Sequence, residues 1–343
     1  MYKINRYDFA KAVVETRVLE KKMLSGPVIA KFLREKDINA IYKELKSSGY
    51  FKNSIKNLTK NNYDELLMTS FEEFIKEITY QATSYEFLDL IFLEYDIFNI
   101  KTIIMEKGND LNYPTRPIEI PRERMERFLS LSQGTWFFIP SKYDSLYQEG
   151  EEIYQNEGAK KLQEYLDRKY FELILEISEQ SGIPLFVQYS KSKIDFYNIM
   201  LVLRMIKIAE RNKQIDKPLV ELTMRENLIA GGYLALDDLI SLYGKSQFKL
   251  KEYFSNSIYD TYLAEGIKVY GYDQDLSILE RCMDNYLIHL CIQNKNIALG
   301  PEPIFGYLMG RKYEMINIRL ILTSIFLNVP EHIIKERLRE SYE

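Results

Sequence analysis

A short pattern occurs three times in this 343-residue chain and constrains its fold more than any other feature. In each copy an acidic residue is followed three positions later by Asn-Ile, and an apolar run continues beyond. The copies are Asp96-Ile97-Phe98-Asn99-Ile100, Asp195-Phe196-Tyr197-Asn198-Ile199 and Glu314-Met315-Ile316-Asn317-Ile318. Counted from each Asn, apolar residues stand one, four and five positions later, which is the spacing of one α-helical face. Each copy is therefore predicted to be a helix.

The distance between the copies predicts a triplicated helical domain. Short-period solenoids repeat every 20 to 50 residues or so. The Asn residues of successive copies, Asn99, Asn198 and Asn317, lie at least about twice as far apart as the longest of these periods. Breaks in the helical pattern at 108–117 and 211–218 set the boundaries, because both segments are polar and contain Pro. The expected units are 1–110, 111–212 and 213–343. The first is expected to open with a helix from Asp8 to Leu24, stopped by Ser25-Gly26-Pro27.

The acid and the Asn of each copy are spaced i, i+3, so both lie along the edge of the apolar stripe and away from solvent. An Asn amide competes for backbone hydrogen bonds inside a helix, so three matched placements indicate a partner on a neighbouring helix. The pairs either fix the packing of each unit or form part of a ligand site, and we favour packing. The six residues are Asp96, Asn99, Asp195, Asn198, Glu314 and Asn317.

Composition favours an all-α fold in the cytosol. Hydrophobic residues make up 46% of the chain, while Gly and Pro number only 15 and 10, and long segments follow the helical period. The net charge of −4 is interspersed, which argues against a nucleic-acid partner because such binding needs a basic patch. No apolar run approaches the roughly 18 residues of a membrane-spanning helix, and the first residues lack a secretory signal.

Motifs for catalysis, cofactors or metals are missing from the sequence. Gly244-Lys245-Ser246 ends like a phosphate-binding loop, but Leu239 stands where that motif needs Gly. Cys282, His289 and Cys291 lack a fourth ligand nearby, so the cysteines are expected to be reduced core residues. No GxSxG nucleophile motif occurs, and nothing singles out a catalytic pair among the 50 acids. We expect no catalytic, cofactor-binding or metal-binding residues.

Three parts of the chain carry a resemblance to a known family. Near the end these are Glu302–Leu308, Tyr313-Glu314 with Asn317–Leu322, and Val329–Arg339. Near the start they are Ala12–Glu20 with Met23-Leu24-Ser25, and in the middle Leu228-Ile229 with Gly231-Gly232 and Leu234. Together these resemble the C subunits of the bacterial and archaeal V/A-type rotary ATPases, which are relatives of the d subunits of vacuolar ATPases. The resemblance covers both ends and the middle, and therefore the whole chain.

The resemblance implies an all-helical, funnel-like fold of three similar units around a pseudo-threefold axis. It also implies a non-catalytic socket, present once per complex, which joins the rotor shaft (the D and F subunits) to the membrane ring of proteolipids. Such a socket is peripheral, on the cytoplasmic side of the membrane, and needs no cofactor. The transported ion and the direction of the motor depend on other components of the complex. The loop around Trp136 has no counterpart that can be aligned.

Two other functions remain as alternatives at this point. A helical scaffold or adaptor outside rotary ATPases would be expected to show repeats of about 34 to 45 residues, which this chain lacks. An enzyme would need a cavity with clustered carboxylates of perturbed pKa.

Overall fold

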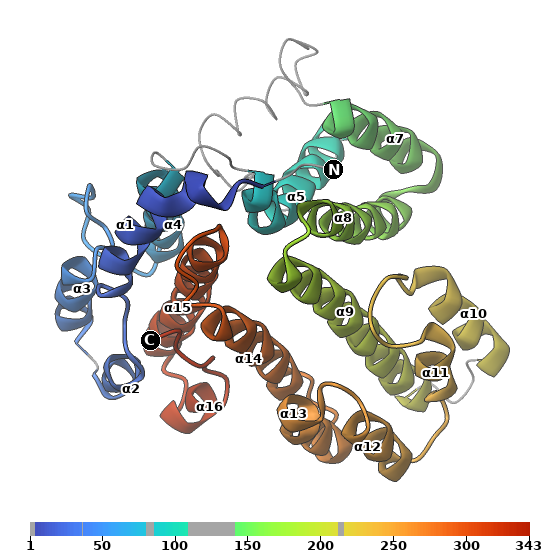
Figure 1. Ribbon diagram of the computed structural model, residues 1–343. Helices are drawn as coiled ribbons and strands as arrows, with labels where there is room; N and C mark the ends of the chain where they lie inside the picture. Colours follow the sequence, from blue (N-terminus) through green and yellow to red (C-terminus); the bar gives the residue numbers. More distant parts are fainter. Residues whose placement is uncertain (1–3, 36, 80–85, 109–140, 212–215) are drawn as a thin grey trace. The chain divides into compact units, whose positions relative to one another are not determined.

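The structure of the chain is a computed structural model (Figure 1). The residues that it describes are 4–35, 37–79, 86–108, 141–211 and 216–343. Within these ranges every regular element is a helix, so the prediction of an all-α fold is confirmed. The loop around Trp136 lies outside the described residues.

Contacts within the chain group its described residues into two compact units. The first takes its residues from Glu86–Ile194 and Glu226–Gly232, and the second takes the others. The division into three repeat units and the funnel-like arrangement stay predictions.

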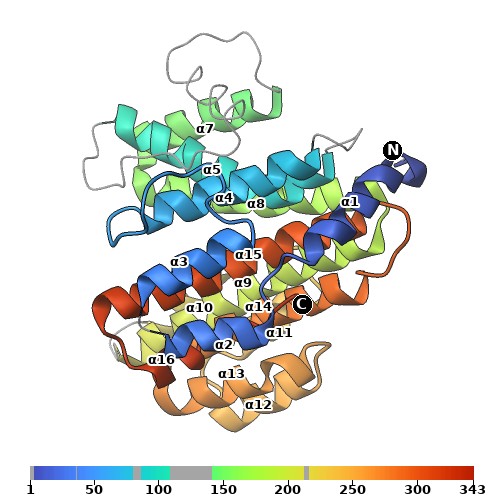
Figure 2. The ribbon, with the colours of Figure 1, turned by 90° about the vertical axis from the view of Figure 1, so that its left-hand side faces the viewer.

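The first unit is built around three helices that pack against one another, α5 (Asp89–Lys107), α7 (Ser141–Glu157) and α8 (Ala159–Ser181). Figures 1 and 2 show them side by side. Glycines with positive φ end two of these helices. Gly158, at φ 84°, separates α7 from α8, and Gly182, at φ 66°, ends α8 in the left-handed conformation that glycine adopts without steric cost. The remaining elements are the short η2 (Glu86–Leu88) and the first part of α9 (Pro184–Arg211).

The second unit contains the rest of α9 and most of the other helices. They are η1 (Arg6–Phe9), α1 (Ala10–Glu20), α2 (Gly26–Arg34), α3 (Ile38–Ser47), α4 (Tyr63–Thr79), α10 (Lys217–Asn227), α11 (Leu236–Ser241), α12 (Gln247–Ser255), α13 (Asp260–Asp273), α14 (Ser277–Gln293), α15 (Glu302–Leu327) and α16 (Glu331–Lys335).

Helix α15 is the centre of the second unit. Every residue from Glu302 to Met315 is buried, including Arg311, Lys312 and Glu314. Helices α1, α2, α4, α14 and α16 all pack against it, as Figure 1 shows for α1, α4 and α14. A helix that is enclosed on all sides needs partners for its polar side chains, because an unpaired charge in the interior is strongly unfavourable.

The opening of the chain differs from the expected single helix between Asp8 and Leu24. The 3-10 turn η1 comes first, and α1 then ends at Glu20. Gly26 and Pro27 begin α2 instead of ending α1. Pro is well suited to the first turn of a helix, where its missing N–H leaves no hydrogen bond unmade.

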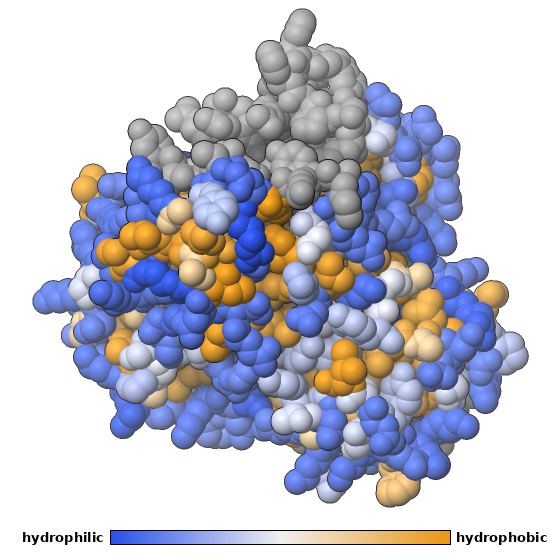
Figure 3. Space-filling view, in the orientation of Figure 1, coloured by the Kyte–Doolittle hydropathy of each residue, from blue (hydrophilic) through white to orange (hydrophobic). Residues whose placement is uncertain are grey.

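Apolar side chains are also exposed on α1. Val14 and Val18 lie one turn apart and are 66% and 54% exposed. Figure 3 shows apolar side chains gathered over the region where Figure 1 draws α1. Among the described residues, no helix is both long and apolar enough to cross a membrane.

Candidate functional site

The acid of the second copy, Asp195, is fully buried on α9. One of its oxygens accepts hydrogen bonds from the backbone N–H of Tyr233, at 2.9 Å, and from the hydroxyl of Tyr259, at 2.6 Å. The other accepts from the backbone N–H of Leu234, at 3.1 Å. The carboxylate therefore holds the backbone at two successive residues that precede α11. Three donors of this kind compensate the loss of hydration of a buried carboxylate.

The acid of the third copy, Glu314, has a similar environment on α15. It is 6% exposed, and one oxygen accepts from the hydroxyl of Tyr50, at 2.7 Å. The same oxygen accepts from the guanidinium of Arg311, at 2.6 Å, and the other accepts from the backbone N–H of Leu24. The second and third copies therefore share one arrangement, in which a buried carboxylate receives a tyrosine hydroxyl and the backbone of a distant segment.

Electrostatics explain why Glu314 needs so many donors. Burial raises the pKa of Glu314, and the charge of Arg311 with the hydrogen bonds from Tyr50 and Leu24 acts to lower it. Burial and then the neighbouring Glu314 raise the pKa of Tyr50 well above its ordinary value, so its hydroxyl stays protonated and donates. Burial alone would lower the pKa of Arg311, but Glu314, Tyr307 and Tyr50 raise it overall, so the guanidinium stays charged.

Aromatic rings surround the guanidinium of Arg311. Its central carbon lies 4.3 Å from the ring centroid of Phe74, 5.3 Å from that of Tyr307 and 5.6 Å from that of Tyr50. These distances are within the range of cation–π attraction, which strengthens when water is excluded. Arg311 and Glu314 therefore form a fully enclosed ion pair on one turn of α15.

Asn317 completes the third copy and is 1% exposed. Its carbonyl oxygen accepts from the backbone N–H of Arg339, and its amide donates to the carbonyl of the same residue, each at 2.9 Å. Arg339 lies beyond α16, in a segment without helical structure. The partner of this Asn is thus a non-helical backbone, whereas the sequence predicts a neighbouring helix.

The other three residues of the repeat are buried as well. Asp96 and Asn99 on α5 are each 1% exposed, and Asn198 on α9 is 0% exposed. The acid and the Asn of a copy lie on one helix in all three cases. Asp195 and Glu314 have different tyrosine partners, and Asp96 and Asn99 belong to the first unit.

Neither tyrosine is signalled by the sequence pattern. Tyr259 lies 64 residues after Asp195, and Tyr50 lies 264 residues before Glu314, so no common spacing connects each acid with its tyrosine. Arg311 is a further buried partner that the sequence reasoning missed, although its i, i+3 spacing from Glu314 is a recognisable ion-pair spacing on a helix.

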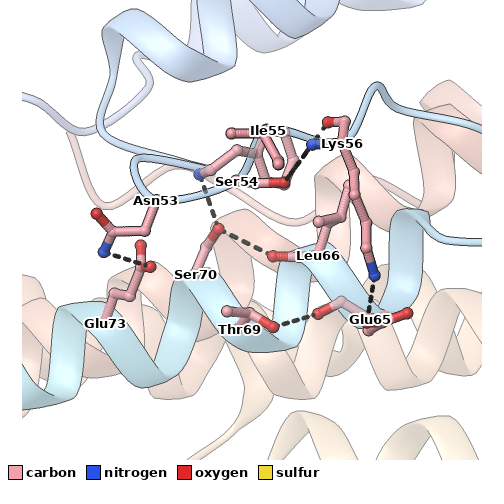
Figure 4. Close-up of a pocket in the computed structure, with 10 residues that line it drawn as sticks. Asn53, Ser54, Ile55, Lys56, Glu65, Leu66, Thr69, Ser70 and Glu73 are labelled. Atoms are coloured by element: carbon pink, nitrogen blue, oxygen red, sulfur yellow. Dashed lines mark hydrogen bonds and ion pairs between the residues drawn. The ribbon is translucent and has the colours of Figure 1, made fainter.

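A pocket of about 230 Å³ lies in the second unit, between the loop that precedes α4 and α4 itself (Figure 4). Side chains of the loop also reach side chains of the helix. The amide of Asn53 donates to Glu73 at 2.9 Å, and the ammonium of Lys56 lies 3.2 Å from a carboxylate oxygen of Glu65. Ile55, at its rim, is fully exposed.

The polar groups of this pocket are largely used by the protein itself. The hydroxyl of Ser70 accepts from the backbone N–H of Phe51 and donates to the carbonyl of Leu66, each at 2.9 Å. Thr69 likewise donates to the backbone of its own helix. A ligand site usually presents several converging polar groups that are available to the ligand. One carboxylate oxygen of Glu73 is buried without a hydrogen-bond partner, but a single group of this kind does not make a candidate active site.

The part of the chain that the structure describes contains no cluster of metal-binding side chains. No group of three or more His, Cys, Asp or Glu residues is placed to hold an ion there. Cys282 and Cys291 are free and buried, as the sequence predicts. Burial raises the pKa of Cys291 to about 12, and burial also raises that of Cys282. Both shifts favour the protonated thiol over the reactive thiolate at neutral pH.

The geometry alone does not show to which proteins the chain is related, but a comparison with protein families does. Residues 12–337 match the family model described as vATP-synt_AC39, ATP synthase (C/AC39) subunit. No match was found among curated proteins. The matched range includes all three copies of the repeat and nearly all of the segments that carry the resemblance noted in the sequence. The chain belongs to the ATP synthase (C/AC39) subunit family of V/A-type ATPases.

Proposed function

We propose that this chain is a non-catalytic component of the central stalk, a socket that couples the rotor shaft (the D and F subunits) to the proteolipid ring. The observation that carries the proposal is the family match over residues 12–337, which spans nearly the whole chain. Coupling transmits rotation between ATP hydrolysis or synthesis and ion transport. In this proposal each complex contains one copy of the chain, which lies at the cytoplasmic face of the membrane without entering it.

The interior of α15 supports a mechanical role. A part that transmits torque has to keep its helices in register under load. The enclosed Arg311–Glu314 ion pair and the bonds from Asn317 to Arg339 fix side chains and backbone in single arrangements. Buried polar groups of this kind favour one packing register over others, because a shifted register leaves them unpaired.

We assign the same packing role to the three acid and asparagine pairs. Asp195 and Glu314 each hold a segment that is distant in sequence, and Asn317 holds a third. Asp96, Asn99 and Asn198 occupy equivalent buried positions on their helices. The pairs act by fixing neighbouring segments to α5, α9 and α15, and they bind no ligand.

The test is a coupling measurement on the rotary complex from the native organism. Complexes purified from cells that lack this chain are expected to hydrolyse ATP without transporting ions, and adding the chain back restores transport. Purified alone, the chain is expected to show no ATP hydrolysis. Undiminished ion transport in the complex without this chain contradicts the socket.

The scaffold or adaptor role outside rotary ATPases predicts a different result. An adaptor would leave both hydrolysis and transport unchanged when it is removed. Membership of an ATP synthase subunit family favours the socket over this alternative.

A further inference from the structure

Residues 338–343 lie along α14 and α15 without forming a regular element. In Figure 1 the C mark stands beside α15, and in Figure 2 beside α14. Because the segment has no helical hydrogen bonds of its own, it depends on side chains of the rest of the second unit for its position. We refer to residues 338–343 as the strap.

Polar contacts hold the first part of the strap. Asn317 on α15 bonds both backbone groups of Arg339, and the guanidinium of Arg339 lies 2.9 Å from Asp284 on α14. The carbonyl oxygen of Asn285, the next residue of α14, accepts from the backbone N–H of Glu340 at 2.9 Å. These contacts fix the path of the strap across two helices.

Tyr342 fills a cleft that two glycines open in α15. Gly306 and Gly310 lie one turn apart, so their missing side chains leave adjacent space on one helix face. A Cβ atom at Gly310 would stand 2.8 Å from the Cβ of Tyr342, and one at Gly306 would stand 3.0 Å from its hydroxyl oxygen. Tyr342 is 5% exposed in this position. Only glycine at both positions allows so close an approach.

The far end of the Tyr342 ring reaches α1. Its hydroxyl donates to the buried carboxylate of Glu20, the last residue of α1, at 3.1 Å. Burial and then Glu20 raise the pKa of Tyr342, so the hydroxyl keeps its proton and remains a donor. Arg17, one turn earlier, pairs with Glu20 at 2.9 Å and also donates to the backbone carbonyl of Ile297, which follows α14.

A second contact connects the same cleft with the end of α1. A Cβ atom at Gly310 would stand 2.7 Å from the terminal methyl group of Met23 as well. Met23 immediately precedes Leu24, whose backbone N–H bonds Glu314. The strap and the segment after α1 therefore meet on α15 at one glycine.

We propose that the strap is a detachable clasp, in which Tyr342 in the Gly306–Gly310 cleft holds α1 against α14 and α15. Because side chains alone hold the strap, it opens more easily than the helices beneath it. Its opening removes the hydroxyl from Glu20 and leaves the end of α1 with fewer contacts. The clasp is a property of the second unit and holds whether or not the chain works in a rotary complex.

Hydrogen exchange of the backbone amides, measured by mass spectrometry on the full chain, tests the clasp. Tyr342→Ala is expected to accelerate exchange in α1 on the order of a hundredfold, because it empties the cleft. Tyr342→Phe keeps the ring and loses the bond to Glu20, so an acceleration of about fivefold is expected. Gly306→Ala, which displaces the hydroxyl end of the ring, is expected to resemble Tyr342→Phe.

Two internal references make the result decisive. Tyr272 on α13 is 78% exposed, so Tyr272→Ala is the same change without a cleft and is expected to leave α1 unaffected. Helix α12 is the second reference, because it packs against α13 and no described contact joins it to the strap. Unchanged exchange in α1 of Tyr342→Ala overturns the clasp. Equal acceleration in α1 and α12 also overturns it, since Tyr342 then contributes only to overall stability.

Discussion

At the scale of single residues, the buried carboxylates of Asp195 and Glu314 have nearly the same set of donors. Each accepts a tyrosine hydroxyl and at least one backbone N–H, although Tyr259 and Tyr50 come from unrelated positions in the sequence. The chemical reason is the same in both copies. A carboxylate without water needs several donors, and a tyrosine hydroxyl supplies a strong one.

Removing either hydroxyl is expected to destabilise the chain by a similar amount. Tyr259→Phe and Tyr50→Phe should each lower the free energy of unfolding by about 1.5–3 kcal/mol, the range for a hydrogen bond to a charged group. Tyr270 is a matched control, because its buried hydroxyl bonds a neutral carbonyl, that of Leu203. Its change to Phe should lower the free energy of unfolding by only about 1 kcal/mol. Equal losses in urea denaturation for all three variants would contradict the special role of the carboxylates.

The two cysteines give a second prediction at this scale. Burial raises the pKa of Cys291 to about 12, and burial also raises that of Cys282. Since the thiolate is the reactive form, neither should react with a maleimide at about pH 8 while the chain is folded. Both should react in denaturant, as counted by intact mass. Rapid labelling of the folded chain would show that a thiol is accessible.

At the scale of elements, the helical period predicts α5, α9 and α15 well but predicts helix ends poorly. The apolar spacing after each Asn follows directly from the side of the helix that is buried. Helix ends depend on local chemistry that admits two outcomes. Gly26-Pro27 reads in the sequence as the end of a helix and instead begins α2, because Pro suits either role. The partners of the buried acids could not be predicted, since long-range contacts leave no spacing in the sequence.

Asn317 gives the element-scale prediction, because it fixes the segment around Arg339 to α15. Asn317→Leu leaves the N–H and the carbonyl of Arg339 without their partner, and a loss of about 2 kcal/mol in the free energy of unfolding is expected. Asn285→Leu is the matched control. It also removes an Asn that bonds the backbone of this segment, but the contact is exposed and water replaces it.

The same reasoning about packing applies to the second copy of the repeat. Asn198→Leu should destabilise the chain as Asn317→Leu does, because Asn198 is 0% exposed. Thermal unfolding of Asn198→Leu and Asn317→Leu, compared with the control Asn285→Leu, checks both copies together. If Asn198→Leu and Asn317→Leu fold and assemble like the unaltered chain, the pairs do not fix packing.

At the scale of the whole molecule, the family match unites observations that are separate in the sequence. It covers residues 12–337 and so includes most of α1, the three copies of the repeat and α16. The all-α class followed from composition and period alone. The family came from motifs at both ends and in the middle, and no single one of them is specific. The proposed contacts with a shaft and a ring could not be predicted residue by residue, because they depend on surfaces of other proteins, which this sequence does not contain.

The most direct test of the proposed function is the recovery of this chain from native membranes through an affinity tag. The socket predicts that one copy co-purifies with the D and F subunits of the rotor shaft and with the ring proteolipid, as identified and counted by mass spectrometry. Recovery of the intact chain without any component of a rotary ATPase would contradict it.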